Sequence, residues 1–82
     1  MIMSVFSVVD AKTGIYSHPF YDVTRGSAVR AFQDTVRTKD HPFNRHPEDY
    51  TLVFIGTYDD NTGRIVSEVP EVIATASNLI VE

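Results

Sequence analysis

Residues 51–69 read TLVFIGTYDDNTGRIVSEV, two apolar runs joined by a short polar segment. The first run, Thr51–Tyr58, is rich in β-branched and aromatic residues, which favour strands. The side chains on both faces of this strand are apolar near its middle. We therefore expect the strand to be central in its sheet or to lie against a partner. Gly56 indicates a bulge or a close approach of two backbones. Arg64–Val69 then returns as the partner strand.

The polar segment Asp59–Gly63, DDNTG, has two features of a calcium loop, an aspartate at position 1 and an asparagine at position 3. A helix-loop-helix calcium loop also requires an oxygen ligand at position 5, glycine at 6 and glutamate at 12. Here those positions hold Gly63, Arg64 and Pro70, and the flanks favour strands. We therefore interpret the segment as a hairpin turn.

The spacing D-x-x-T-G occurs a second time, at Asp10–Gly14, again between two strand-like runs. An aspartate can hydrogen-bond the backbone two residues on, and a glycine adopts the positive φ that such turns require. The repeat predicts a first hairpin formed by Ile2–Val9 and Ile15–Tyr16. We expect Phe20 and Tyr21, which follow it, to anchor the next connection in the core.

Between the two hairpins the sequence predicts one helix. Thr24 or Ser27 can cap its first turn by accepting a hydrogen bond from a backbone N–H. The apolar residues that recur at helical spacing, and so form one core-facing stripe, are Ala28, Val29, Phe32 and Val36. We expect the helix to end near 38–40 and the chain to continue as a loop to Pro47.

The chain after the second hairpin is interrupted by Pro70, and Val72–Val81 is expected to form a last element, a strand or a short helix. The predicted fold is therefore α+β, a small antiparallel sheet from two hairpins flanking one helix, in the order ββαββ plus that last element. Residues 1–82 are expected to form a single domain.

The chain is short and has no cysteine. Its 82 residues give a thin hydrophobic core, and disulfides and cysteine-ligated zinc are excluded. Self-association, as a homodimer, is an expected source of further burial.

No apolar run approaches the roughly 20 residues of a membrane span, and Met1–Val5 lacks the basic start of a signal peptide. A cytoplasmic protein is therefore expected.

Charge is unevenly distributed along the chain. The net charge is -4, which disfavours a simple basic nucleic-acid binder. Residues 25–45, however, have a net charge of +3 from five basic and two acidic residues, and residues 46–82 have a net charge of -6. Such a molecule can bind anions locally, or bind a second copy of itself head to tail.

No catalytic constellation is recognisable. The serines are scattered, and there is no nucleophile elbow and no glycine-rich phosphate loop. The residues with metal-ligating side chains are His41, His46, Glu48 and Asp49, which we interpret as exposed loop residues because a proline-broken loop offers no preformed face. We expect no enzyme, no cofactor and no metal.

Nucleic-acid binding requires cations for phosphates and aromatic side chains on which unpaired bases stack. The candidates for phosphate contacts are Arg25, Arg30, Arg37, Lys39 and Arg45, and those for stacking are Tyr16, Tyr21, Phe43 and Tyr50. In the alternative interpretation the arginines solvate the outer face of the helix and the aromatic residues fill a small core. Composition alone favours that alternative.

The segment His46–Gly63, HPEDYTLVFIGTYDDNTG, resembles the small non-structural protein of gokushovirus-type microviruses, phages with circular single-stranded DNA genomes. Pro19–Phe20 and the helix segment Ala28–Val36 fit the same family, and the similarity extends from about Val5 to Ile65. The resemblance implies a DNA-binding protein that acts in genome replication, in the switch from duplex replication to the production of single strands.

Two hypotheses follow. In the first, the protein is a homodimer that binds single-stranded DNA through the candidate residues above. In the second, it is a non-enzymatic regulator that binds a phage replication or capsid protein or a host factor. The acidic second half of the chain and an exposed sheet edge suit the second hypothesis, because a sheet edge can accept an added strand.

Overall fold

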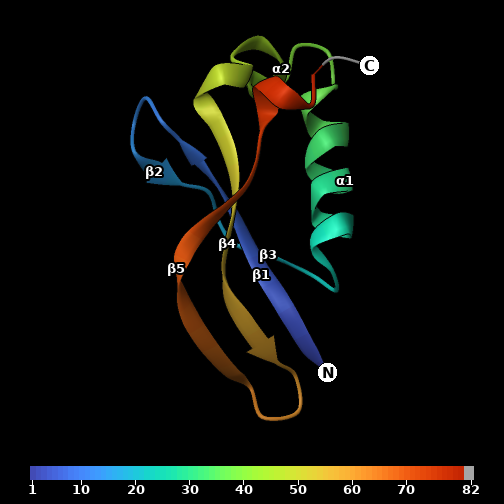
Figure 1. Ribbon diagram of the computed structural model, residues 1–82, viewed down its shortest axis with the longest axis vertical. Coiled ribbons are helices and arrows are strands. Elements are labelled where there is room, and N and C mark those ends of the chain that lie inside the picture. The colour runs from blue at the N-terminus through green and yellow to red at the C-terminus, as the bar shows by residue number, and fades with distance from the viewer. Residues whose placement is uncertain (81–82) are drawn as a thin grey trace.

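The computed structural model describes residues 1–80, in which a five-stranded antiparallel sheet is packed against one long helix (Figure 1). The strand order is β2-β1-β4-β5, and β3 also pairs with β1. The α+β fold class is therefore confirmed. The elements are β1 (Ile2–Asp10), β2 (Ile15–Tyr16), β3 (Phe20–Asp22), α1 (Arg25–Val36), α2 (Pro42–Arg45), the 3₁₀ helix η1 (Pro47–Asp49), β4 (Tyr50–Asp59), β5 (Arg64–Thr75) and the 3₁₀ helix η2 (Ala76–Asn78).

The two D-x-x-T-G turns have the same structure. The amide of Gly14 donates to the carbonyl of Asp10, and that of Gly63 donates to the carbonyl of Asp59, both at 2.7 Å. In each turn the aspartate side chain accepts from the amide two residues on, at 2.9 Å. Both glycines have positive φ, 72° and 73°. The hairpin interpretation of both segments is confirmed.

β4 lies between β1 and β5, as its two apolar faces predicted. Gly56 marks a close approach of two backbones, because a Cβ atom there would lie 2.2 Å from the carbonyl oxygen of Val66. The register of β4 with both neighbours shifts beside it. Ile55 is the extra residue that this bulge inserts opposite β1.

The expectation that Pro70 interrupts the strand is wrong. The ladder pairs Gly56 with Ser67 and Phe54 with Glu71, so residues 68–70 lie opposite Ile55 alone. Pro70 sits in this bulge, where the ladder requires no donor from it. β5 therefore continues to Thr75, and η2 follows. The end of the expected last element, at Val81, lies outside the described residues.

α1 begins where the capping residue predicted. The Thr24 hydroxyl accepts from the amide of Ser27 at 3.1 Å. The following segment was expected to be a loop, but it contains the helical turn α2. The ring nitrogen Nδ1 of His41 caps that turn by accepting from the amide of Phe43 at 3.1 Å, and Pro42 occupies the first turn, where its missing N–H costs nothing.

The core lies between α1 and one face of the sheet. It is formed by buried side chains of the sheet, Phe6, Val8 and Leu52, which pack against the buried helix residues Phe32 and Val36. None of the helices in the described part of the chain is long and apolar enough to cross a membrane.

Phe20 and Tyr21 do not both anchor the core, contrary to expectation. Phe20 stacks on Phe6, with ring centroids 5.8 Å apart. Tyr21 is 47% exposed, because successive side chains of a strand point to opposite faces and β3 directs only Phe20 toward α1.

The second face of the sheet is turned away from α1. Residues opposite each other on paired strands share a face, so the ladders identify its members. We call this surface the open face, and it comprises Met3, Val5, Ser7, Val9, Tyr16, Tyr21, Thr51, Val53, Gly56, Tyr58, Ile65, Ser67, Val72 and Thr75. None of these residues is charged.

Candidate nucleic-acid interface

α1 presents two of the predicted phosphate-binding residues on one side. Arg30 and Arg37 are seven residues apart, so they lie on the same side of the helix, about 10 Å apart along its axis. Both are exposed. Arg25, at the first position of α1, lies closer to the sheet.

Arg25 is engaged in an ion pair. Its guanidinium donates two hydrogen bonds to the Glu71 carboxylate, at 2.7 and 2.9 Å, and its central carbon lies 4.9 Å from the centroid of the Phe54 ring. These hydrogen bonds raise the pKa of Arg25 and hold the pKa of Glu71 below its ordinary value. Arg25 therefore ties α1 to β5, and its guanidinium is already engaged by an acidic side chain.

Arg37 follows α1 as its C-cap residue. Its Nε donates to the carbonyl oxygen of Leu79 at 2.9 Å, which fixes the chain after η2 against the end of the helix. The Arg37 side chain therefore has a structural role at this end of α1.

The remaining three predicted cations are exposed. Arg30 lies in the middle of α1, Lys39 in the connection after it, and Arg45 at the end of α2. We call these three residues the cationic group. Their side chains make no ion pair within residues 1–80.

The predicted stacking residues are divided between two sides of the sheet. Tyr16 and Tyr21 lie on the open face and are 48% and 47% exposed. Phe43 lies in α2, half-buried, with its ring centroid 4.5 Å from that of Tyr50 and 5.6 Å from that of Phe32. The structure therefore brings Phe43 and Tyr50 together against the core and leaves the other two tyrosines away from the cationic group.

Sequence reasoning missed a third tyrosine on the open face. Tyr58 lies beside Tyr21, with ring centroids 5.5 Å apart. Simple alternation along β4 assigns Tyr58 to the face of Leu52 and Phe54, but the bulge at Ile55 shifts the alternation by one residue. Gly56 was the available signal, since it indicated the bulge.

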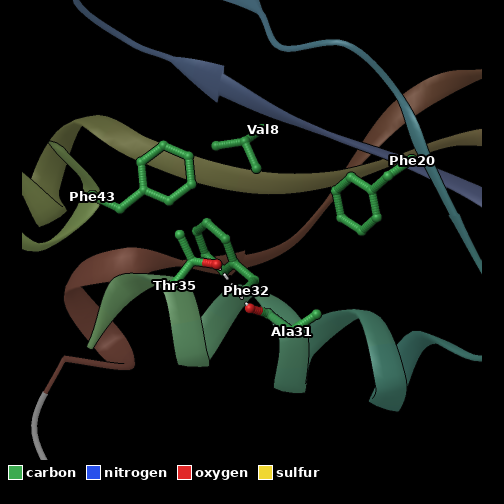
Figure 2. Close-up of a pocket in the computed structure, with 6 residues that line it drawn as sticks. All are labelled: Val8, Phe20, Ala31, Phe32, Thr35 and Phe43. Carbon is green, nitrogen blue, oxygen red and sulfur yellow. Dashed lines mark hydrogen bonds between the residues drawn. The ribbon is translucent and has the colours of Figure 1, made fainter. Parts of the chain in front are cut away.

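A hollow of about 210 Å³ opens between α1 and the sheet. In Figure 2, Phe20 and Phe43 stand at its two ends with Phe32 between them. The Thr35 hydroxyl on its wall donates to the Ala31 carbonyl at 3.1 Å. Apart from Thr35 the lining is apolar, and none of it is charged, so the hollow offers no cation for a phosphate.

The four residues with metal-ligating side chains, which we interpreted as exposed loop residues, come together only in part. Ligand atoms of His46, Glu48 and Asp49 lie within 4.8 Å of one another at the start of η1. His41 is separate, since its Nδ1 caps α2. Two carboxylates and one imidazole are ligand types that divalent cations accept, but His46 and Glu48 are exposed to water, which competes for any ion.

Comparison with known proteins gives one match. A family model described as Phage ORF5 protein matches residues 3–79. No curated protein and no solved structure matches the chain.

Proposed function

Because the chain belongs to the Phage ORF5 protein family, we propose that it is a phage protein of the microvirus type that binds single-stranded DNA during genome replication. The resemblance of His46–Gly63 to the microvirus non-structural proteins supports the assignment to replication. In this proposal the protein acts in the host cytoplasm, by binding and without catalysis.

The cationic group carries the proposal. Arg30, Lys39 and Arg45 are exposed and have no acidic partner in the described part of the chain, although acidic residues outnumber basic ones 11 to 7 overall. A cation that is not paired within its own chain can replace the counterions of a phosphate, and the release of those counterions drives binding. The local positive charge thus offers a contact that the net charge of -4 conceals.

The position of the tyrosines determines whether the cationic group can act together with base stacking. Tyr16 and Tyr21 lie on the open face, whereas the cationic group belongs to the helical side of the sheet. A strand held by the cationic group is therefore bound through its phosphates, without base stacking on those tyrosines. Binding through phosphates alone carries no sequence information, so we expect little sequence preference.

Such binding suits the switch in replication that the resemblance implies. A protein that coats newly exposed single strands regardless of sequence keeps them from serving as templates for a second strand. Accumulation of single strands for packaging then depends on how much of the protein is present.

The test is a fluorescence-polarisation titration of the full chain into a labelled single-stranded oligonucleotide at two salt concentrations. Three phosphate contacts predict that the logarithm of the association constant falls by about 2 for each tenfold rise in salt. Absence of binding at low salt, or an affinity indifferent to salt, contradicts the proposal.

A second candidate function, a regulator that binds another phage or host protein, is favoured by the edge of the sheet. β5 has no strand on its outer side within residues 1–80, and residues 61–72 are all exposed. An added strand can pair with such an edge, although the bulge at 68–70 divides it into two short stretches. Capture of a partner protein that survives nuclease treatment supports this candidate over DNA binding.

A further inference from the structure

β5 is an edge strand of the sheet. β4 pairs with one side of it, and no strand within residues 1–80 pairs with the other side (Figure 1). Such an edge presents a row of backbone N–H and C=O groups, and a second extended chain is the partner that forms a regular hydrogen-bond ladder with them. The chemistry of the edge therefore specifies a polypeptide strand as its partner.

The half of β5 next to the 59–63 turn is a regular part of this edge. Residues 64–67 pair one by one with β4, without a bulge or a proline among them. Ile65 and Val66 point to opposite faces of the sheet and are still 62% and 54% exposed. An exposed, regular and apolar edge is the kind that pairs with another chain.

Two charges flank Val66 at equal spacing. Arg64 lies two residues before it and Glu68 two residues after it, so alternation along the strand puts all three side chains on the same face. Both charged side chains are exposed, and neither forms an ion pair in the described part of the chain. Asp59 lies opposite Arg64 on β4, but its carboxylate accepts from the amide of Asn61.

We propose that two copies of this chain form a dimer by antiparallel pairing of their β5 edges, with Val66 on the two-fold axis. A two-fold contact brings residue i of one copy opposite residue j of the other, and j opposite i. With Val66 opposite its own counterpart, Arg64 of each copy lies opposite Glu68 of the other. The dimer therefore contains two cross-strand ion pairs, and opposite charges in such positions stabilise a sheet.

The charges select this register over its neighbours. A two-fold axis at Ser67 would oppose Arg64 with Pro70, which has no N–H to donate. An axis at Ile65 would oppose Glu68 with the turn. The register with Val66 on the axis is the one that pairs both charges, and it places the apolar Val66 side chains of the two copies side by side.

The ends of the proposed ladder coincide with interruptions in the chain. Before Arg64 the chain forms the 59–63 turn, and after Glu68 the bulge of residues 68–70 continues. The bulge of each copy meets the other copy where that chain is already turning away. The contact is therefore short, and interfaces of such small area correspond to weak, reversible association.

The two-fold axis is perpendicular to the sheet, so α1 of both copies lies on the same side of one continuous sheet. The cationic group of each copy lies on α1, on α2 and in the connection between them, away from β5. The proposal therefore goes beyond DNA binding and does not depend on it, because each copy has its own cationic group.

Reversal of charge tests the contact, because the two ion pairs are reciprocal. Glu68→Arg opposes two arginines in both pairs, and Arg64→Glu opposes two glutamates. The double variant Arg64→Glu/Glu68→Arg restores both pairs with the signs exchanged and keeps the net charge of -4. Glu48→Arg, at an exposed position in η1, is the control with the same change of charge as Glu68→Arg.

The measurement is sedimentation equilibrium of the full chain at low salt, with far-UV circular dichroism to verify that each variant is folded. We expect the unmodified chain to approach twice the monomer mass of 9.2 kDa at high micromolar concentration. We expect each single reversal to raise the dimer dissociation constant at least about tenfold, and the double variant to return it to within about threefold of the original value. Glu48→Arg should leave it unchanged.

A monomeric unmodified chain overturns the proposal and leaves the edge to a strand of a different protein. A dimer that the single reversals leave intact, that the double variant does not restore, or that Glu48→Arg weakens equally also overturns it. If one single reversal fails to fold, the other single reversal and the double variant decide the same question. DNA binding, measured separately, can fail or succeed without affecting this result.

Discussion

The guanidinium of Arg25 and the carboxylate of Glu71 are joined by two hydrogen bonds, 2.7 and 2.9 Å long, across 46 residues of sequence. This contact fastens the first turn of α1 to β5 beside the ring of Phe54. It also gives one of the candidate phosphate-binding arginines an acidic partner, whereas the three residues of the cationic group have none within residues 1–80.

The Arg25–Glu71 pair predicts a specific loss of stability in acid. The pKa of Glu71 is lowered in the folded state by the hydrogen bonds from Arg25, so its contribution is present above the unfolded-state pKa and is lost as pH falls through the folded-state pKa. We expect Glu71→Gln to lower the melting temperature at neutral pH and to show a smaller further decrease on acidification. Glu68→Gln, on the same strand and without an ion pair in residues 1–80, is the control. Identical acid dependence in the two variants contradicts the role of the pair.

The bulge at Gly56 predicts opposite effects of two glycine substitutions. A Cβ at Gly56 would lie 2.2 Å from the Val66 carbonyl oxygen, so Gly56→Ala must displace backbone, and we expect a loss of at least about 2 kcal/mol of unfolding free energy. A Cβ at Gly26 would meet nothing closer than Thr24 Oγ1 at 3.9 Å. Gly26→Ala should therefore leave stability unchanged or raise it by up to about 1 kcal/mol. Urea denaturation measures both, and a Gly56→Ala chain as stable as the original would show that the two strands do not approach this closely.

The capping bond at the start of α1 predicts which of two hydroxyl residues matters. The Thr24 side chain accepts from the amide of Ser27, so Thr24→Ala should reduce the unfolding free energy by about 1 kcal/mol. Ser27→Ala removes a hydroxyl that takes no part in this bond and should change stability by less than about 0.5 kcal/mol. If the two substitutions have equal effects in urea denaturation, the cap is misassigned.

Local chemistry was sufficient to predict the two hairpins, the helix and the close approach at Gly56. Each depends on a few adjacent residues, such as the aspartate and glycine of Asp10–Gly14. The continuation of β5 through Pro70 was not predictable in the same way. A strand tolerates a proline only where the neighbouring strand needs no N–H donor at that position, and this depends on how the two strands pair. The cap that His41 gives to α2 was missed because histidine is not among the usual capping residues.

The candidate site was predictable in its residue types and not in its arrangement. The excess of cations in residues 25–45 is visible in the sequence. The neutralisation of Arg25 depends on an acid from a distant strand, and the grouping of Tyr58 with Tyr21 depends on a bulge that changes the alternation of β4. Such relationships arise from tertiary pairing, so no local pattern contains them.

The account is tested most directly by comparing two double variants with the same net charge. Arg30→Gln/Arg45→Gln removes two members of the cationic group, and Lys12→Gln/Arg64→Gln removes two cations next to the hairpin turns. The measurement is fluorescence polarisation with a labelled single-stranded oligonucleotide at low salt. We expect Arg30→Gln/Arg45→Gln to weaken binding at least about tenfold and to reduce its salt dependence. We expect Lys12→Gln/Arg64→Gln to bind like the unmodified chain. Equal weakening by both variants, or no weakening by the first, would contradict the assignment of DNA binding to the cationic group.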